Sequence, residues 1–283
     1  MSGRLTPVRA PGWIDTLAPV AQTADDTVTG RAERRMLGLE LLAVIGVSYL
    51  LSGLTSLLSF IRAQVVIQHG FGFSHVATGP LKSGTNTVHY QWLDILDQLA
   101  SILQGIAPAF LALVLLARTP GGSGFGVNFR VPRWRDLEAG AGFAAVIGVP
   151  GLALVYVARQ LGLNAQIVVT DFPDVWYRVP TLILEAFQQG IGEEVVVAAF
   201  VLTRLRQLGW SPVRALAAAS VLRGSYHLYQ GFGGFAGNFV MGVVFGWWFQ
   251  RTRRVWPLVI AHGIIDSVSF VGYIYLHDKV SWI

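Results

Sequence analysis

The sequence has 283 residues, of which 53% are hydrophobic and only 13% are charged, and its mean hydropathy is +0.53. A soluble domain has about a quarter of its residues charged, and a soluble chain of this size cannot bury so many apolar helices on every face. The composition therefore indicates an integral membrane protein. The absence of cysteine excludes disulfides, iron–sulfur clusters and thiolate metal sites. The net charge of +5 gathers at the ends of apolar stretches, which membrane orientation explains better than nucleic-acid binding.

The chain begins with a polar segment and continues as a series of apolar stretches. Residues 1–36 carry no secretory signal, and we expect a mostly disordered cytoplasmic tail there. The later stretches are about 20 residues long, the length that a helix needs to cross the hydrocarbon core. The predicted transmembrane helices are 37–61, 97–117, 138–158, 181–203, 213–230, 234–250 and 256–276.

These stretches predict an all-α, polytopic membrane protein of about seven transmembrane helices. We expect one transmembrane domain over 37–283, in which the last four helices form a core of catalytic type. Arginine-rich loops alternate with poorer ones from the tail to the last loop. Because basic residues concentrate on the cytoplasmic side, the alternation predicts an inner-membrane protein with its N-terminus in the cytoplasm and its C-terminus outside.

The long first loop, about 62–96, contains three histidines. His69, His75 and His89 are separated by six and fourteen residues, which fits no common metal motif. We therefore interpret them as solvated loop histidines.

Ionisable side chains inside the predicted helices are confined to the second half of the chain. Each such group is energetically costly in a bilayer and is a functional candidate by default. The first three predicted helices have almost none away from their ends. The last four contain Glu185, Glu193, Glu194, Arg223, His227, His262 and Asp266.

The spacing of these residues predicts that they meet around one wet cavity. Glu193 and Glu194 are adjacent, so they point about 100° apart, and one can face a cavity while the other meets a structural partner. Arg223 with His227, and His262 with Asp266, are pairs one helical turn apart. Glu185 lies either at the mouth of the cavity or in the headgroup region, and we favour the headgroup region.

This set of groups suits the activation of water. A carboxylate held in the bilayer can act as a general base near neutral pH. A neighbouring histidine can orient the same water, or it can bind a metal together with Glu193. A divalent metal such as zinc is therefore an option, held by Glu193, His227 and His262. The second histidine and its partner Asp266 can stabilise an oxyanion.

The order and spacing of these residues resemble a known family. Glu193-Glu194, then His227, then His262-x-x-x-Asp266 are similar to the three motifs of the CAAX-protease/bacteriocin-processing (CPBP, Abi) family of intramembrane proteases, over about residues 180–270. The resemblance implies an intramembrane endopeptidase that cuts a membrane-associated peptide or protein. It implies that Glu193 and His227 position the attacking water, and that His262 and Asp266 support the oxyanion. It leaves metal dependence open, because the family is described as having both metal-dependent and metal-free members.

The sequence departs from the family pattern at two positions. Ala198 stands where the family usually has arginine, and Arg223 stands where it usually has phenylalanine. We hypothesise that the arginine has moved between helices, so that Arg223 forms a structural ion pair with Glu194. The departures also favour an alternative, an inactive family member that acts as a scaffold or chaperone for another membrane protein. A transporter with a proton relay is disfavoured, because the sequence has no inverted repeat.

Overall fold

The computed structural model describes residues 28, 30–66, 76–78, 91–118, 131–168 and 174–280. The predicted tail up to residue 27 and the three histidines of the first loop lie outside the described residues.

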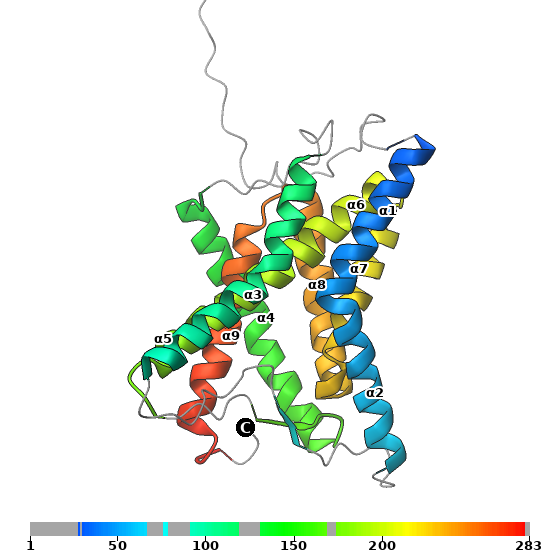
Figure 1. Ribbon diagram of the computed structural model, residues 1–283. Helices are drawn as coiled ribbons and strands as arrows, with labels where there is room; N and C mark the ends of the chain where they lie inside the picture. The colour runs from blue at the N-terminus through cyan, green and yellow to red at the C-terminus, as the bar shows by residue number, and fades with distance from the viewer. Residues whose placement is uncertain are drawn as a thin grey trace, which may run out of the picture.

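Seven helical runs make up nearly all of the described chain (Figure 1). The first run joins α1, η3 and α2, and the fourth joins α5, η4 and α6; in both, a π-helical segment (η3 or η4) connects two α-helices without a break. The element bounds are α1 Arg31–Ile45, η3 Gly46–Leu50, α2 Leu51–Val66, α3 Gln91–Ala117, α4 Trp134–Gln160, α5 Arg178–Glu193, η4 Glu194–Val201, α6 Leu202–Gln207, α7 Pro212–Tyr226, α8 Phe232–Thr252 and α9 Trp256–Leu276. A 3-10 turn, η5 (Leu228–Gln230), separates α7 from α8.

Each helical run coincides with one predicted stretch, and the last matches it at both ends. Several boundaries differ. Helices α1 and α3 begin at Arg31 and Gln91, each six residues before the predicted boundary, because polar residues in their first turns interrupt the apolar pattern. Helix α2 continues to Val66, five residues past the predicted end, so the first loop is shorter than predicted. Two three-residue strands, β1 (Val76–Thr78) and β2 (Gln166–Val168), pair in parallel and were not predicted.

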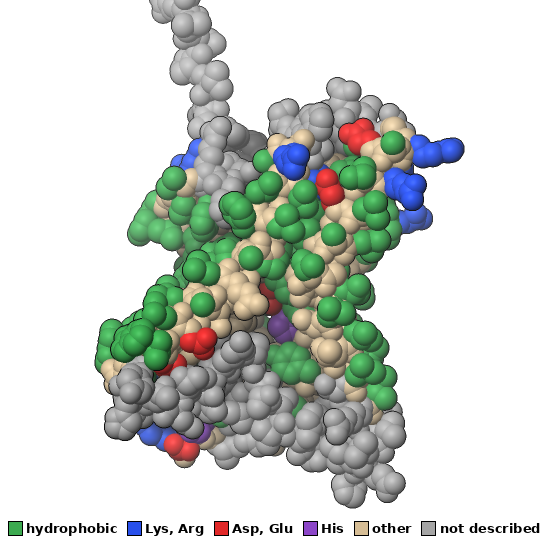
Figure 2. Space-filling model, viewed as in Figure 1, with side chains coloured by type: hydrophobic (Ala, Val, Ile, Leu, Met, Phe, Trp, Pro, Cys, Tyr) green, Lys and Arg blue, Asp and Glu red, His purple; other side chains and the backbone are tan. Residues whose placement is uncertain are grey.

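The chain is a polytopic membrane protein. Within the described part of the chain, five helices are long and apolar enough to cross a membrane: Arg31–Leu58, α3, α4, α8 and α9. Large apolar side chains cover the outside of the bundle along its height (Figure 2). Leu103, Val146 and Val149 are about 70% exposed in the isolated chain. Such a surface is stable in contact with lipid tails.

The run α5–η4–α6 lies at the centre of the bundle. Helix α5 packs against α3 and α9, and η4 also contacts α3, α7 and α8. All eight residues of η4, Glu194–Val201, are buried. Glu194, the ionisable residue of η4, is therefore surrounded by protein rather than by lipid.

Two part-buried ion pairs connect helices at the end of the bundle where α1 and α4 begin. Arg204 donates to Glu40 at 2.7 Å and to the carbonyl of Leu115 at 2.8 Å, so one side chain of α6 binds both α1 and α3. Arg254, just after α8, pairs with Asp136 in the first turn of α4. These contacts fix the helices that surround the central run.

Small residues allow the closest helix contacts. Gly140 of α4 faces α9, and a Cβ atom at this position would lie 2.6 Å from Cγ2 of Ile260. Gly142, one half-turn away on the same helix, has no atom within 4 Å of an added Cβ. On the same helix, a side chain is therefore sterically excluded at Gly140 and has free space at Gly142.

We expect Gly140→Val to lower the free energy of unfolding by about 1–3 kcal/mol, because overpacking separates α4 from α9. Gly142→Val is the matched control and should change it by less than about 0.5 kcal/mol. Unfolding of both purified variants in detergent measures the difference. Equal stability of the two variants would show that α4 and α9 do not pack as described.

Candidate active site

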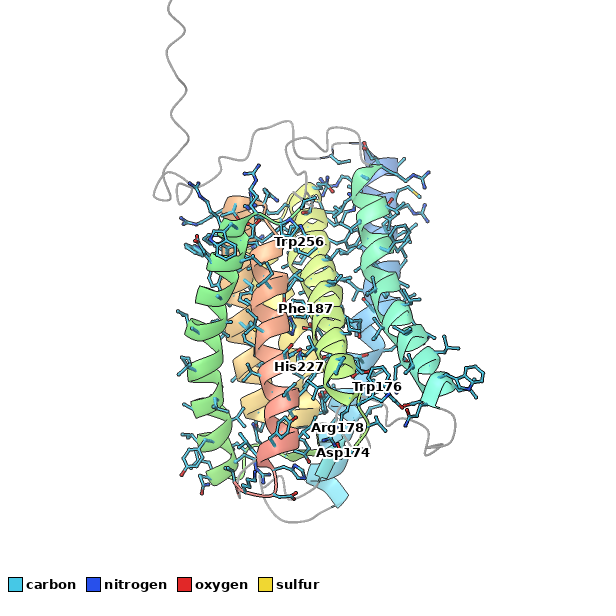
Figure 3. All side chains as sticks on the ribbon, turned by 90° about the vertical axis from the view of Figure 1, so that its left-hand side faces the viewer. Asp174, Trp176, Arg178, Phe187, His227 and Trp256 are labelled. Atoms are coloured by element: carbon cyan, nitrogen blue, oxygen red, sulfur yellow. The ribbon has the colours of Figure 1, made fainter. Side chains whose placement is uncertain are left out.

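A cavity of about 1900 Å³ opens between the helices in the middle of the bundle. Its polar lining includes Glu193, His227, His262 and Asp266, and much of its apolar wall comes from α4. In the space-filling view a recess in the surface exposes acidic and histidine side chains at its bottom (Figure 2). His227 lies between the end of the bundle that carries Trp256 and the end that carries Asp174 (Figure 3). The cavity thus places ionisable groups away from both ends of the bundle.

The two adjacent glutamates have different surroundings. Glu193 lines the cavity, whereas Glu194 does not and is fully buried. The helix changes from α to π form between them, and π segments are frequent at functional sites. Their different directions along the helix thus give one cavity-facing carboxylate and one buried carboxylate.

Arg223 lies at the centre of the charged cluster and is 1% exposed. Its NH1 is 2.7 Å from Oε1 of Glu194, and its NH2 is 3.3 Å from Oε2 of Glu193. Gly242 of α8 leaves room for this side chain, since a Cβ there would lie 3.3 Å from Cδ of Arg223. The guanidinium therefore neutralises charge on both carboxylates, not only on the Glu194 partner that the sequence suggested.

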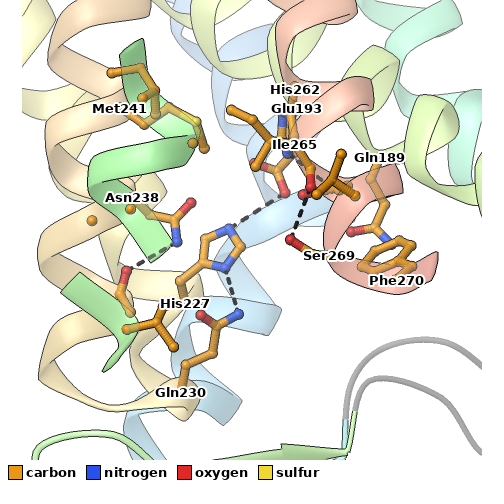
Figure 4. Close-up of a pocket in the computed structure, with 18 of the residues that line it drawn as sticks. Gln189, Glu193, His227, Gln230, Asn238, Met241, His262, Ile265, Ser269 and Phe270 are labelled. Atoms are coloured by element: carbon orange, nitrogen blue, oxygen red, sulfur yellow. Dashed lines mark hydrogen bonds and ion pairs between the residues drawn. The ribbon is translucent and has the colours of Figure 1, made fainter. Parts of the chain in front are cut away.

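His227 faces the free oxygen of Glu193. Nε2 of His227 lies 3.5 Å from Oε1 of Glu193 and has no hydrogen-bond partner among the described residues. The other ring nitrogen, Nδ1, lies 3.3 Å from Nε2 of Gln230 (Figure 4). Oε2 of Glu193 accepts a hydrogen bond from the Tyr226 hydroxyl at 2.8 Å, on the same oxygen that Arg223 approaches. Oε1 is thus left for the cavity.

His262 is held between two carboxylates. Its Nδ1 lies 2.8 Å from Oε1 of Glu194, and its Nε2 lies 3.2 Å from Oδ2 of Asp266. Gly190 of α5 allows α9 to come this close, since a Cβ there would lie 3.4 Å from Cβ of His262. The ring therefore has one orientation, and both of its nitrogens are engaged.

The donors that could bind a metal are already in contact with a cation. Among the described residues, Glu193, Glu194 and His262 each offer an atom within 4.8 Å of the others, an oxygen and nitrogen set suited to zinc. The metal ligands predicted from the sequence were Glu193, His227 and His262, with His227 in place of Glu194. The Arg223 guanidinium contacts both of these carboxylates and lies 3.1 Å from Nδ1 of His262. A divalent ion would have to displace this buried positive charge, so the residues as arranged do not fit a metal.

Sequence reasoning missed two of the residues that contact the site. Tyr226 and Gln230 flank His227 and bind Glu193 and His227 respectively. Their spacing from His227 gives no sign of this, because α7 ends at Tyr226 and the chain turns through η5. Glu185 was expected in the headgroup region, but it is 5% exposed and lines the cavity. The expectation was wrong because α3 and α9 pack over this part of α5.

Residues 175–268 match a family model described as type II CAAX prenyl endopeptidase Rce1-like. This stretch runs from just before α5 into α9 and contains every charged residue of the cluster. Over these residues the match confirms the resemblance to the CAAX-protease family that was found in the sequence. No curated protein and no solved structure matched the chain.

Arg223→Ala should lower the free energy of unfolding by about 3–5 kcal/mol, because it leaves two buried carboxylates without their cation. Adding Glu194→Gln should recover part of this loss, since one of the two charges is then removed. Arg214→Ala, which removes an exposed arginine from the same helix, is the control and should have little effect. Unfolding midpoints in detergent measure all three, and a double variant no more stable than Arg223→Ala would refute the ion pair.

Zinc should raise the unfolding midpoint of Arg223→Ala and leave that of the wild type unchanged. The variant frees the two carboxylates and His262, whereas the wild-type guanidinium excludes a second cation. Adding Glu193→Gln to Arg223→Ala should abolish the zinc effect. A wild-type midpoint that rises with zinc and falls with chelator would contradict the exclusion of metal.

Proposed function

We propose that the chain is an intramembrane endopeptidase of the CAAX/bacteriocin-processing type that hydrolyses a peptide bond in a membrane-associated peptide or protein. The family match supports the reaction class, and the ionisable side chains around Glu193 are the groups that would carry out the reaction. The substrate reaches the cavity from the bilayer, and nucleic acid has no part in the function.

The observation that carries this proposal is the gap between Glu193 and His227. Oε1 and Nε2 are 3.5 Å apart, both residues line the cavity, and Nε2 lacks a partner among the described residues. This separation is at the limit of a direct hydrogen bond, so no water fits between the two atoms. Both residues line the cavity, however, and a water molecule on the cavity side of the pair can contact the carboxylate oxygen and the imidazole nitrogen together.

Glu193 acts as the general base. Arg223 and Tyr226 bind Oε2 and hold the carboxylate in place, while Oε1 faces the water. The water oxygen attacks the peptide carbonyl carbon as its proton passes to Oε1. Glu193 then returns this proton to the nitrogen of the leaving amine, and the C–N bond breaks. His227 orients the water, and Gln230 fixes the ring of His227.

His262 and Asp266 support the oxyanion. Nε2 of His262 contacts the Asp266 carboxylate. As negative charge develops on the substrate oxygen, this oxygen replaces Asp266 as the acceptor of the Nε2–H group. The pairing with Glu194 on the opposite nitrogen keeps the ring aimed into the cavity. This places a hydrogen-bond donor where negative charge develops.

We propose that all seven helical runs cross the inner membrane, with the N-terminus in the cytoplasm and the C-terminus outside. The two runs that are less apolar, α5–η4–α6 and α7, carry Glu193, Glu194 and Arg223, and their charges are neutralised inside the bundle. The alternation of arginine-rich loops supports this orientation.

One contact favours a second function, that of an inactive scaffold for another membrane protein. Arg223 approaches Glu193 as well as Glu194, and an arginine beside a general base stabilises its negative charge. If this effect is strong enough, the carboxylate cannot accept a proton from water. The cleavage assay below separates the two functions.

We expect Glu193→Gln to reduce kcat/KM by about 10²–10⁴-fold, the contribution of a general base. The assay uses purified protein and a library of quenched hydrophobic peptides. Glu138→Gln removes an exposed carboxylate of α4 and should leave cleavage unchanged. Folded wild type that cleaves no peptide would favour the scaffold function, and full activity in Glu193→Gln would exclude the proposed base.

A further inference from the structure

A second group of buried polar side chains lies between α3 and α5, outside the cluster around Arg223. Asp94 and Gln98 of α3 are each 2% exposed, and Glu185 of α5 is 5% exposed. Among the described residues, four of their atoms are buried without a hydrogen-bond partner: Oδ1 of Asp94, both amide atoms of Gln98 and Oε2 of Glu185.

The two helices run in parallel with a constant register, which aligns these residues. The Tyr177 hydroxyl donates to Oδ2 of Asp94 at 2.5 Å, and Gln188 lies against Gly105 in a very close approach. The two residues of each pair are 83 positions apart in the sequence. Because this separation is the same for both pairs, α3 and α5 lie side by side and run in the same direction (Figure 1). The same offset places Gln98 at the level of Thr181, which is also buried.

On α5, Thr181, Glu185, Gln189 and Glu193 follow one another at intervals of four residues and so form a stripe along one side of the helix. The last three of them line the cavity. Gln98 lies about one turn beyond the cavity-lining residues Ser101 and Ile102 of α3. Polar positions therefore continue from Glu193 back toward the start of α5, just before which the side chain of Asp174 is 92% exposed.

We infer that a file of water molecules occupies this α3–α5 interface and supplies the water that Glu193 activates. Buried polar groups in proteins are almost always hydrogen-bonded, and ordered water satisfies those that protein atoms do not reach. No lipid tail can do so. The presence of water at this interface does not depend on the proposed function. Its delivery to Glu193 does, because each hydrolysis consumes one water molecule at a site inside the membrane.

The chain has no cysteine, so single cysteines can report the presence of water. Only a thiol that can ionise reacts quickly with a charged thiosulfonate reagent. The variants are Gln98→Cys and Thr181→Cys, tested in full-length protein in membranes opened so that the reagent reaches both faces. Leu99→Cys, on the outer surface of α3, and Ala109→Cys, in its dry core, are the controls.

We expect at least one of the two interface cysteines to react about 10-fold or more faster than both controls, as hydration of the thiol requires. Interface cysteines that react no faster than Ala109→Cys would overturn the inference. This readout needs no peptide cleavage. Labelling without cleavage by wild type would thus support the water file while refuting the protease, and cleavage without labelling would do the reverse.

A second measurement tests the supply of water to the reaction. Glu185→Gln keeps a hydrogen-bonding group in the file, whereas Glu185→Leu interrupts it. We expect kcat to fall about 10-fold or more in Glu185→Leu with little change in KM, and to recover most of the way in Glu185→Gln. Equal kcat values in the two variants would contradict a role for hydration at this position.

Discussion

The arrangement of the whole central region depends on one buried guanidinium. Arg223 lies between the carboxylates of Glu193 and Glu194, where neither lipid nor bulk water can stabilise charge. Without it, the α5–η4 run would bury two neighbouring carboxylates with no cation beside them. With it, three helices close around a polar centre, since His262 of α9 also binds Glu194. The same contact that permits the bundle to close also decides which oxygen of Glu193 is available for chemistry.

The helices could be predicted because apolar length and the bilayer thickness determine them. The prediction for 256–276 matches α9 at both ends. The sequence also identified the charged residues that meet, because each is costly unless it has a partner inside the membrane. The sequence could not show that Arg223 contacts Glu193. This contact depends on the course of the Arg223 side chain from α7 and on the room that Gly242 of α8 leaves for it. The π segment that begins at Glu194 has no sequence signal of its own, and all of its residues are buried.

The division of labour within the site follows from burial. Glu194 and Arg223 are surrounded by protein and provide charge balance, while Glu193 and His227 line the cavity. Membrane proteins commonly keep their costly ionisable groups inside the bundle or around a water-filled space, and this chain does both. At the two departures from the family pattern, Ala198 and Arg223, the cation that pairs with Glu194 comes from the neighbouring helix. Buried polar groups along α3 and α5 continue beyond this cluster.

The most direct test of the account is a single-turnover cleavage in water enriched in oxygen-18, followed by mass spectrometry of both product and enzyme. If Glu193 activates a water that attacks the peptide carbonyl, one labelled oxygen enters the new carboxyl group of the product and none enters the protein. Label in a peptide containing Glu193 or Glu194 would instead reveal a covalent intermediate on a carboxylate. Product without label, or no product from folded protein, would contradict the proposal that this cluster activates water.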